Sequence, residues 1–225
     1  MTIATGTPRV LPLGVLVSGS GSNLQAILDA IARRELRAEV RIVVSNKPDV
    51  FALTRAERAG IPTCVVDSKR YQHREAFDAA VVETLSRHAV EVVMLAGFMR
   101  IVTPVLLGAF PWRVVNVHPA LCPSFPGTHS PRQALQYGVC VAGCTVHLVD
   151  AGVDTGPILA QAVVPVLQGD DEATLQARIQ AEEHRLVPFV LQWFADDLVR
   201  VDASGEKPRA IVSTSKRVFG LSELY

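Results

Sequence analysis

An amide and an imidazole stand two residues apart in the run Asn116-Val117-His118-Pro119. Residues two apart in a strand project from the same face, so we expect Asn116 and His118 to lie side by side. Pro119 predicts the end of that strand. Open α/β sheets bind ligands at the carboxyl ends of their strands, which favours a site here over a pair of structural polar residues. An amide and an imidazole could stabilise an oxyanion and transfer a proton.

A candidate carboxylate follows in the run Val153-Asp154-Thr155-Gly156-Pro157. Taken alone, an aspartate in such a run is most often a turn residue. A histidine that acts as an acid or base is, however, commonly oriented by a carboxylate, and Asp154 could supply it. No serine lies in a G-x-S-x-G pattern and no cysteine has a histidine at motif spacing. The sequence therefore indicates direct group transfer through a tetrahedral intermediate.

A glycine-rich turn, Ser18-Gly19-Ser20-Gly21-Ser22-Asn23, lies between a predicted strand and a predicted helix. Backbone N–H groups at such a helix N-terminus can hold a phosphate. The turn is not a P-loop, because no Gly-Lys-Ser/Thr follows, and Leu24 occupies the third glycine of a dinucleotide fingerprint. Phosphate binding and a plain strand–helix turn capped by Ser22 both remain open on this evidence.

Short apolar segments alternate with helical patterns before these residues, which predicts βαβ units. We expect strands over 10–17, 40–44, 63–66, 91–95 and 113–117, and helices over 22–34, 51–59, 74–88 and 103–110. A proline-rich loop over 119–131 precedes strands over 143–149 and 157–166 and a helix over 172–194. The predicted fold class is α/β, a single domain with a mostly parallel twisted sheet and helices on both faces. A peripheral tail follows from 203.

The composition excludes several classes of protein. The 225 residues carry 22 Lys+Arg and 22 Asp+Glu, which argues against nucleic acid as a partner. Apolar stretches such as 10–17 and 92–99 have eight residues, too few to span a membrane, and no secretory signal is visible. Cys140 and Cys144 have no second pair, and the histidines at 118, 129 and 147 lack ligand spacing, so we expect no metal. The four cysteines indicate reduced thiols and a cytoplasmic protein.

These motifs together resemble the folate-dependent phosphoribosylglycinamide formyltransferases. The resemblance runs from residue 15 to residue 195, and its segments are Ser18–Ile27, Ser45-Asn46-Lys47, Leu95-Ala96-Gly97-Phe98-Met99-Arg100, Asn116-Val117-His118-Pro119 with Phe125-Pro126-Gly127, and Asp154-Thr155-Gly156-Pro157. It implies a formyltransferase domain over 1–202, with a nucleotide half over 10–110, a folate and catalytic half over 111–202, and a tail over 203–225.

The resemblance implies transfer of the formyl group of 10-formyltetrahydrofolate, as co-substrate, to the amine of glycinamide ribonucleotide in purine biosynthesis. Asn116 and His118 would bind the oxyanion, and Asp154 would support the charge of His118 and help move the proton. The implied nucleotide contacts are Gly21, Ser22, Asn23, Gln180 and Glu183. The implied folate contacts are Arg74, Met99, Arg100, Ile101, Val102, Asp150, Ala151, Gly152 and Val153.

The chain departs from the family pattern at three places. Thr155 replaces a common glycine, Cys122 replaces a usual leucine, and the loop over 149–152 lacks the family's acidic character. His129 lies in the proline-rich loop and could help order Asp154. Both His129 and His147 could equally be structural.

Three alternative functions compete with formyl transfer to glycinamide ribonucleotide. A formyltetrahydrofolate hydrolase would usually carry an additional N-terminal regulatory domain, and about 14 residues precede the end of the first strand. An enzyme that formylates initiator tRNA would need a basic C-terminal RNA-binding domain. A catalytically silent nucleotide-binding module would not need Asn116, His118 and Asp154. We expect a monomer or a homodimer that acts on two small molecules.

Overall fold

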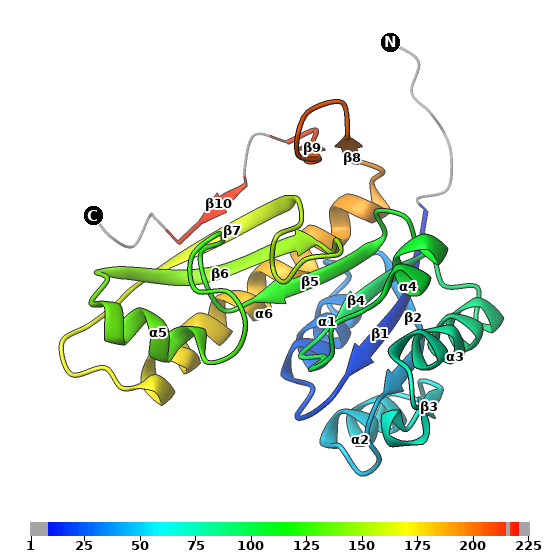
Figure 1. Ribbon diagram of the computed structural model, residues 1–225. Helices are drawn as coiled ribbons and strands as arrows, with labels where there is room; N and C mark the ends of the chain where they lie inside the picture. The colour runs from blue at the N-terminus through cyan, green and yellow to red at the C-terminus, as the bar shows by residue number, and fades with distance from the viewer. Residues whose placement is uncertain (1–8, 215–216, 221–225) are drawn as a thin grey trace.

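A computed structural model describes residues 9–214 and 217–220 (Figure 1). Within these residues the main sheet has the strand order β10-β7-β6-β5-β4-β1-β2-β3. A separate hairpin joins β8 to β9. The strands are β1 (Leu11–Val17), β2 (Ala38–Ser45), β3 (Thr63–Val65), β4 (Val92–Leu95), β5 (Val114–His118), β6 (Val141–Leu148), β7 (Ile158–Pro165), β8 (Val199–Asp202), β9 (Arg209–Val212) and β10 (Val218–Phe219).

The sheet changes direction at the strand that carries the amide–imidazole pair. Strands β1 to β5 are mutually parallel, whereas β6 is antiparallel to both β5 and β7. The described helices are α1 (Ser22–Ala32), α2 (Phe51–Arg58), α3 (Arg74–Arg87), α4 (Pro104–Ala109), α5 (Ser130–Tyr137) and α6 (Glu172–Ala195), with a short 3-10 helix at Ser68–Arg70. The predicted α/β class and mostly parallel sheet are confirmed.

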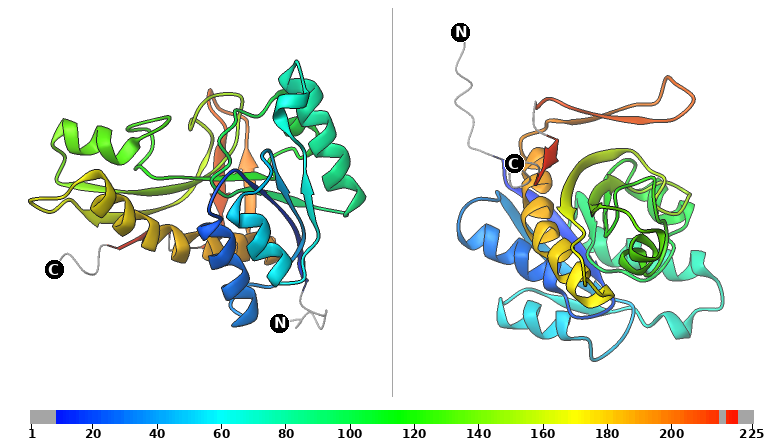
Figure 2. Two further views of the ribbon diagram at one scale, coloured as in Figure 1. Left: turned by 90° about the horizontal axis from the view of Figure 1, so that it is seen from below. Right: turned by 90° about the vertical axis from the view of Figure 1, so that its left-hand side faces the viewer.

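Helices cover both faces of the sheet (Figure 2). One core layer joins the sheet to α1, α2, α5 and α6, and the other joins it to α3 and α4. Strands β1 and β4 lie between the layers and are apolar along almost their whole length, because both of their faces are covered.

Helix α6 brings a distant part of the chain to the glycine-rich turn. A capping box between Asp171 and Thr174 starts the helix. Leu175, Ile179 and Val190 are fully buried at helical spacing. The helix packs on β6, β7 and α1, so its middle lies beside the start of α1.

Several elements were not predicted from the sequence, namely α5, β8, β9, β10 and the 3-10 helix. Helix α5 begins inside the expected loop at Ser130 and ends at Gly138, whose φ is 83°. Eight residues are too few for a clear helical period. Strand β9 lies in the segment expected to be a peripheral tail, yet Ala210 and Val212 are buried in the larger core layer. The division into a domain over 1–202 and a tail over 203–225 stays a prediction, and β8 and β9 pair across it.

Among the described residues, no helix has the length and apolar character needed to cross a membrane.

Candidate active site

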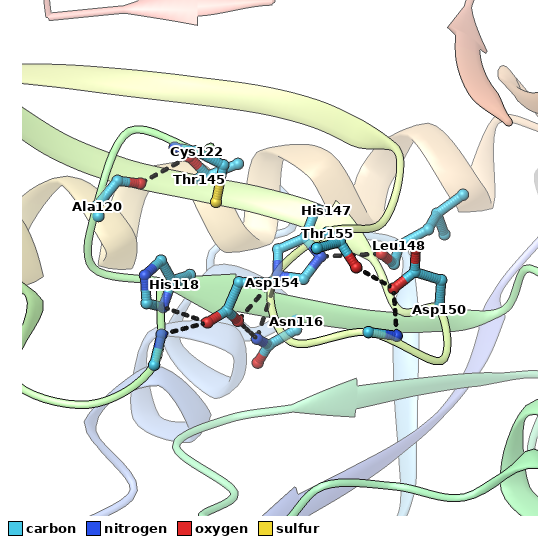
Figure 3. A network of polar contacts seen from close by, with 12 residues as sticks. Asn116, His118, Ala120, Cys122, Thr145, His147, Leu148, Asp150, Asp154 and Thr155 are labelled. Atoms are coloured by element: carbon cyan, nitrogen blue, oxygen red, sulfur yellow. Dashed lines mark hydrogen bonds and ion pairs between the residues drawn. The ribbon is translucent and has the colours of Figure 1, made fainter. Parts of the chain in front are cut away.

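Asn116 and His118 project from the carboxyl end of β5 toward Asp154 (Figure 3). His118 is buried and Asn116 is half-buried. Asp154 comes from the loop between β6 and β7, which folds back over this end of β5. The structure thus brings together the three residues whose types suggested chemistry in the sequence.

Both ring nitrogens of His118 face oxygen acceptors. Nε2 lies 2.8 Å from the carbonyl oxygen of Phe125, and Nδ1 lies 3.3 Å from Oδ2 of Asp154. The hydroxyl of Ser130 lies 3.3 Å from Nε2. A neutral imidazole could donate to only one of the two acceptors, whereas the protonated ring donates to both. Oxygen acceptors therefore flank the His118 ring on both of its nitrogens.

Asp154 is held as a charged acceptor. Burial alone would raise the pKa of this carboxyl, but the nearby ring of His147, the backbone N–H of Gly127 at 2.9 Å and the nearby charge of His118 outweigh it and lower the pKa. The amide of Asn116 lies 3.5 Å from Oδ1. The residue has φ 55°, a left-handed conformation that aspartate and asparagine adopt more readily than most residues.

His147 belongs to this cluster, although the sequence left it without a role. It is buried on β6 directly opposite Asn116, because the two are register partners. Its Nδ1 lies 2.9 Å from the carbonyl of Leu148, and its Nε2 lies 3.2 Å from the amide of Asn116 and 3.7 Å from Asp154. Only the antiparallel register of β5 and β6 reveals this proximity, so no spacing in the sequence signals it.

His129 does not contact Asp154 as suggested from the sequence. Its Nδ1 lies 2.9 Å from Oε1 of Glu172, the first residue of α6. The residues that order Asp154 are instead Gly127, Asn116 and His147.

A cavity of about 570 Å³ opens over the cluster. The loop after β4 and the loop after β6 line it on two sides. Arg100 also lies over the ring of Phe77, 4.5 Å from its centroid, which fixes its side chain toward α3. Met99 is 67% exposed and Ile101 is 53% exposed, so apolar surface is available for a flat ligand. The predicted folate residues that line the cavity are Met99, Arg100, Ile101, Val102, Asp150, Gly152 and Val153.

Two predicted folate residues lie outside that lining. Arg74 is the exposed first residue of α3, and Ala151 is exposed at the outer side of its loop. The structure does not bring either residue together with the others.

A second cavity, of about 290 Å³, lies at the N-terminus of α1. Gly21 has φ 71°, and a Cβ at this position would stand 2.6 Å from Cβ of Ala52, so the turn requires glycine. Gln180 donates to the hydroxyl of Ser22 over 3.0 Å, and Asn23 donates to Glu183 over 2.9 Å. All five predicted nucleotide residues line this cavity: Gly21, Ser22, Asn23, Gln180 and Glu183.

Glu183 is the unusual acid of this second cavity. Only 5% of it is exposed, and burial raises its pKa to about 7, although the hydrogen bond from Asn23 opposes the shift. The Oδ1 atom of Asn23 is buried with no hydrogen-bond partner. A ligand with hydroxyl groups could satisfy both the carboxyl and this oxygen.

The two cavities share a wall and therefore adjoin. Gly97, Met99, Val117, Pro119 and Gln176 line both. Ligands bound in the two cavities would thus lie next to each other.

A buried hydroxyl connects the loops of the two cavities. Ser18 donates to Oδ1 of Asn46 over 2.6 Å and accepts from the backbone N–H of Met99 over 2.9 Å. The end of β1 and the loop after β4 are therefore held together beneath the shared wall.

The departures from the family pattern have local structural consequences. Thr155 donates to Oδ1 of Asp150 over 2.8 Å, and the same oxygen accepts from the N–H of Gly152 over 3.0 Å (Figure 3). One carboxylate oxygen of Asp150 thus bridges two residues of the loop after β6. Cys122 is buried, and burial raises the pKa of its thiol, so the thiol stays protonated near neutral pH.

Among the described residues, no group of three or more His, Cys, Asp or Glu side chains is arranged to hold a metal ion.

Comparison with known proteins assigns this architecture to a family. A family model described as formyl transferase matches residues 12–191, and the chain belongs to that family. Within it, the chain groups with the phosphoribosylglycinamide formyltransferases. The enzyme of that name from Escherichia coli (strain K12) is 44% identical over 187 residues, which cover 83% of this chain and 88% of that protein. The one from Bacillus subtilis (strain 168) is 39% identical over 193 residues, 86% of this chain and 97% of that protein.

Solved and longer relatives agree with this grouping. The crystal structure of glycinamide ribonucleotide transformylase 1 from Symbiobacterium toebii superposes with a TM-score of 0.88 at 45% identity, and covers 94% of this chain and 98% of that one. The human trifunctional purine biosynthetic protein adenosine-3 is 44% identical over 194 residues, 86% of this chain but 19% of that protein.

Proposed function

We propose that this chain transfers the formyl group of 10-formyltetrahydrofolate to the amine of glycinamide ribonucleotide. The observation that carries the proposal is the convergence of Asn116, His118 and Asp154 in the larger of two cavities that adjoin. Such an arrangement suits a direct transfer between two bound molecules, because neighbouring sites turn a bimolecular step into a unimolecular one.

The nucleotide occupies the smaller cavity in this proposal. Its phosphate lies at the N-terminus of α1, where backbone N–H groups and the helix dipole favour an anion. Ser22 and Gln180 add donors to the phosphate. Glu183 and Asn23 accept hydrogen bonds from the ribose hydroxyls. The glycinamide amine then points across the shared wall toward Asn116.

The folate occupies the larger cavity, with its pterin against the apolar loop that contains Met99 and Ile101 and its formyl group at the end of β5. Attack by the amine nitrogen on the formyl carbon forms a tetrahedral intermediate. The amide of Asn116 and the positive charge of the His118 ring stabilise its oxyanion. The carboxylate of Asp154 supports the imidazolium and helps carry the proton from the attacking nitrogen to the departing folate nitrogen. No metal ion is needed for these steps.

The assay that tests the function uses the purified chain with 10-formyltetrahydrofolate, in the presence and in the absence of glycinamide ribonucleotide. We expect folate to be consumed and formylated nucleotide to appear only when the nucleotide is present. Folate consumption that is independent of the nucleotide would identify a hydrolase and refute the proposal.

A further inference from the structure

One exposed loop makes a direct contact with each of two catalytic groups. The carbonyl of Phe125 lies 2.8 Å from Nε2 of His118, and the N–H of Gly127 donates to Oδ2 of Asp154 over 2.9 Å. The loop has little core of its own, because the residues from 126 to 129 are exposed. Local contacts support it in part, because Phe125 packs on the core and Gln133 donates to the carbonyls of Pro126 and Thr128.

Glu172 adds a link from this region to the start of α6. Its Oε1 lies 2.9 Å from Nδ1 of His129, and its Oε2 lies 2.7 Å from Nε of Arg132. His129 is two residues beyond Gly127, and Arg132 lies in the first turn of α5. Glu172 itself is the first residue of a long helix that is anchored in the core. One carboxylate thus ties the end of the loop and the helix that follows it to a rigid element.

We propose that Glu172 is a positioning residue for formyl transfer, which acts by holding the loop over 125–129 so that Phe125 and Gly127 keep His118 and Asp154 in place. This inference rests on the proposed function. Glu172 and His129 both line the larger cavity, at the side where α6 passes from one cavity to the other. The contact therefore lies at the mouth of the site and not in the core.

The energies favour an effect on turnover over an effect on stability. Exposed ion pairs contribute about 0–1 kcal/mol to folding, and both partners of Glu172 are more than half exposed. A displacement of catalytic groups by about 1 Å can, however, cost about 100-fold in rate. Removal of the carboxylate should therefore leave the fold intact while the catalytic groups lose their alignment.

The test combines amide exchange with kinetics in the full chain. In Glu172→Ala, without substrates, we expect the Gly127 amide to exchange at least tenfold faster, while amides of β6 exchange as in the wild type. We expect kcat to fall at least tenfold and the KM for the nucleotide to change less than threefold. Glu172→Gln keeps one acceptor oxygen, so its kcat and its exchange rate at Gly127 should lie between those of the wild type and of Glu172→Ala.

Glu182→Ala is the matched control. It removes the same charge from the same helix, where Glu182 is paired with Arg185 and lines neither cavity. We expect wild-type kcat and wild-type exchange at Gly127. A double variant of Glu172→Ala with His129→Ala should be no worse than Glu172→Ala alone, because Glu172→Ala already removes the contact that His129→Ala breaks.

Wild-type exchange at Gly127 in Glu172→Ala, or an unchanged kcat, would overturn the inference. Equal acceleration of exchange in β6 would do the same, because it would reveal a general loss of stability. If the wild type itself failed to transfer a formyl group, the proposed function would be wrong, and exchange at Gly127 would still decide whether Glu172 holds the loop.

Discussion

Asp154 combines a functional carboxylate with an unusual backbone conformation. Its left-handed φ means that Asp154→Ala would change both the charge and the backbone strain, whereas asparagine tolerates this conformation. In Asp154→Asn the imidazolium of His118 loses its counter-charge. We therefore expect kcat to fall by about 100- to 10,000-fold, with both KM values within about threefold.

Steady-state kinetics with each substrate varied in turn measures this effect, and the thermal midpoint of the variant serves as the control for folding. A folded Asp154→Asn enzyme with a kcat within threefold of the wild type would remove Asp154 from the proposed mechanism.

Glu183 makes stability depend on pH in a direction opposite to that of an ordinary surface acid. Its pKa is raised by burial from 4.5 to about 7, so the folded state binds this proton more tightly than the unfolded state. The resulting stability is fully present below pH 4.5 and is lost as the pH rises through 7. Because one pKa unit corresponds to about 1.4 kcal/mol, the wild type should lose about 3 kcal/mol relative to Glu183→Gln between pH 4.5 and pH 8.

Urea unfolding of both proteins at several pH values provides the comparison, in which the other titrating groups cancel. If the free energies of unfolding of the wild type and Glu183→Gln differ by the same amount at every pH in this range, the assignment of a raised pKa to Glu183 is wrong.

At the scale of the element, the turn between β1 and α1 requires glycine at one position and tolerates alanine at another. Gly21→Ala would force a Cβ into Ala52 and into a left-handed φ, so we expect a loss of about 1–3 kcal/mol in stability and a raised KM for the nucleotide. Gly19→Ala is the matched control, because a Cβ there meets nothing within 4 Å. Denaturant unfolding and nucleotide kinetics measure both effects, and equal behaviour of the two variants would refute the assignment.

The sequence predicted those elements whose signals are local. Continuous apolar segments located β1 and β4, and helical spacing located α6 to within one residue at its C-terminal end. Asn116 and His118 were recognisable because a period of two places them on one face. His147 was not, because its proximity to Asn116 depends on the pairing of two strands 31 residues apart. The contacts of Gly127 and Phe125 involve backbone atoms, which no residue type reveals.

At the scale of the whole molecule, the segment after β8 contributes to the core but not to the cavities. Ala210 and Val212 are buried, whereas none of the residues that line either cavity comes from the described part of the chain after residue 202. We expect a variant that ends at Asp202 to lose about 2–4 kcal/mol of stability from this lost burial. Its kcat at a temperature where it is folded should stay within about threefold of the wild type.

Thermal unfolding and the formyl transfer assay check the two parts of this prediction. Ala210→Asp in the full chain is the control, since it should destabilise the same layer without shortening the chain. A truncated protein that is folded but inactive would give this segment a role in the site.

The shared wall of the two cavities also bears on unproductive side reactions. In the proposed arrangement water is a competing nucleophile, and while the smaller cavity lacks its ligand, solvent fills the space next to the formyl group. In this proposal a bound nucleotide replaces that solvent with the reacting amine itself. Each bound substrate therefore excludes water from the other, which limits hydrolysis of the formyl group.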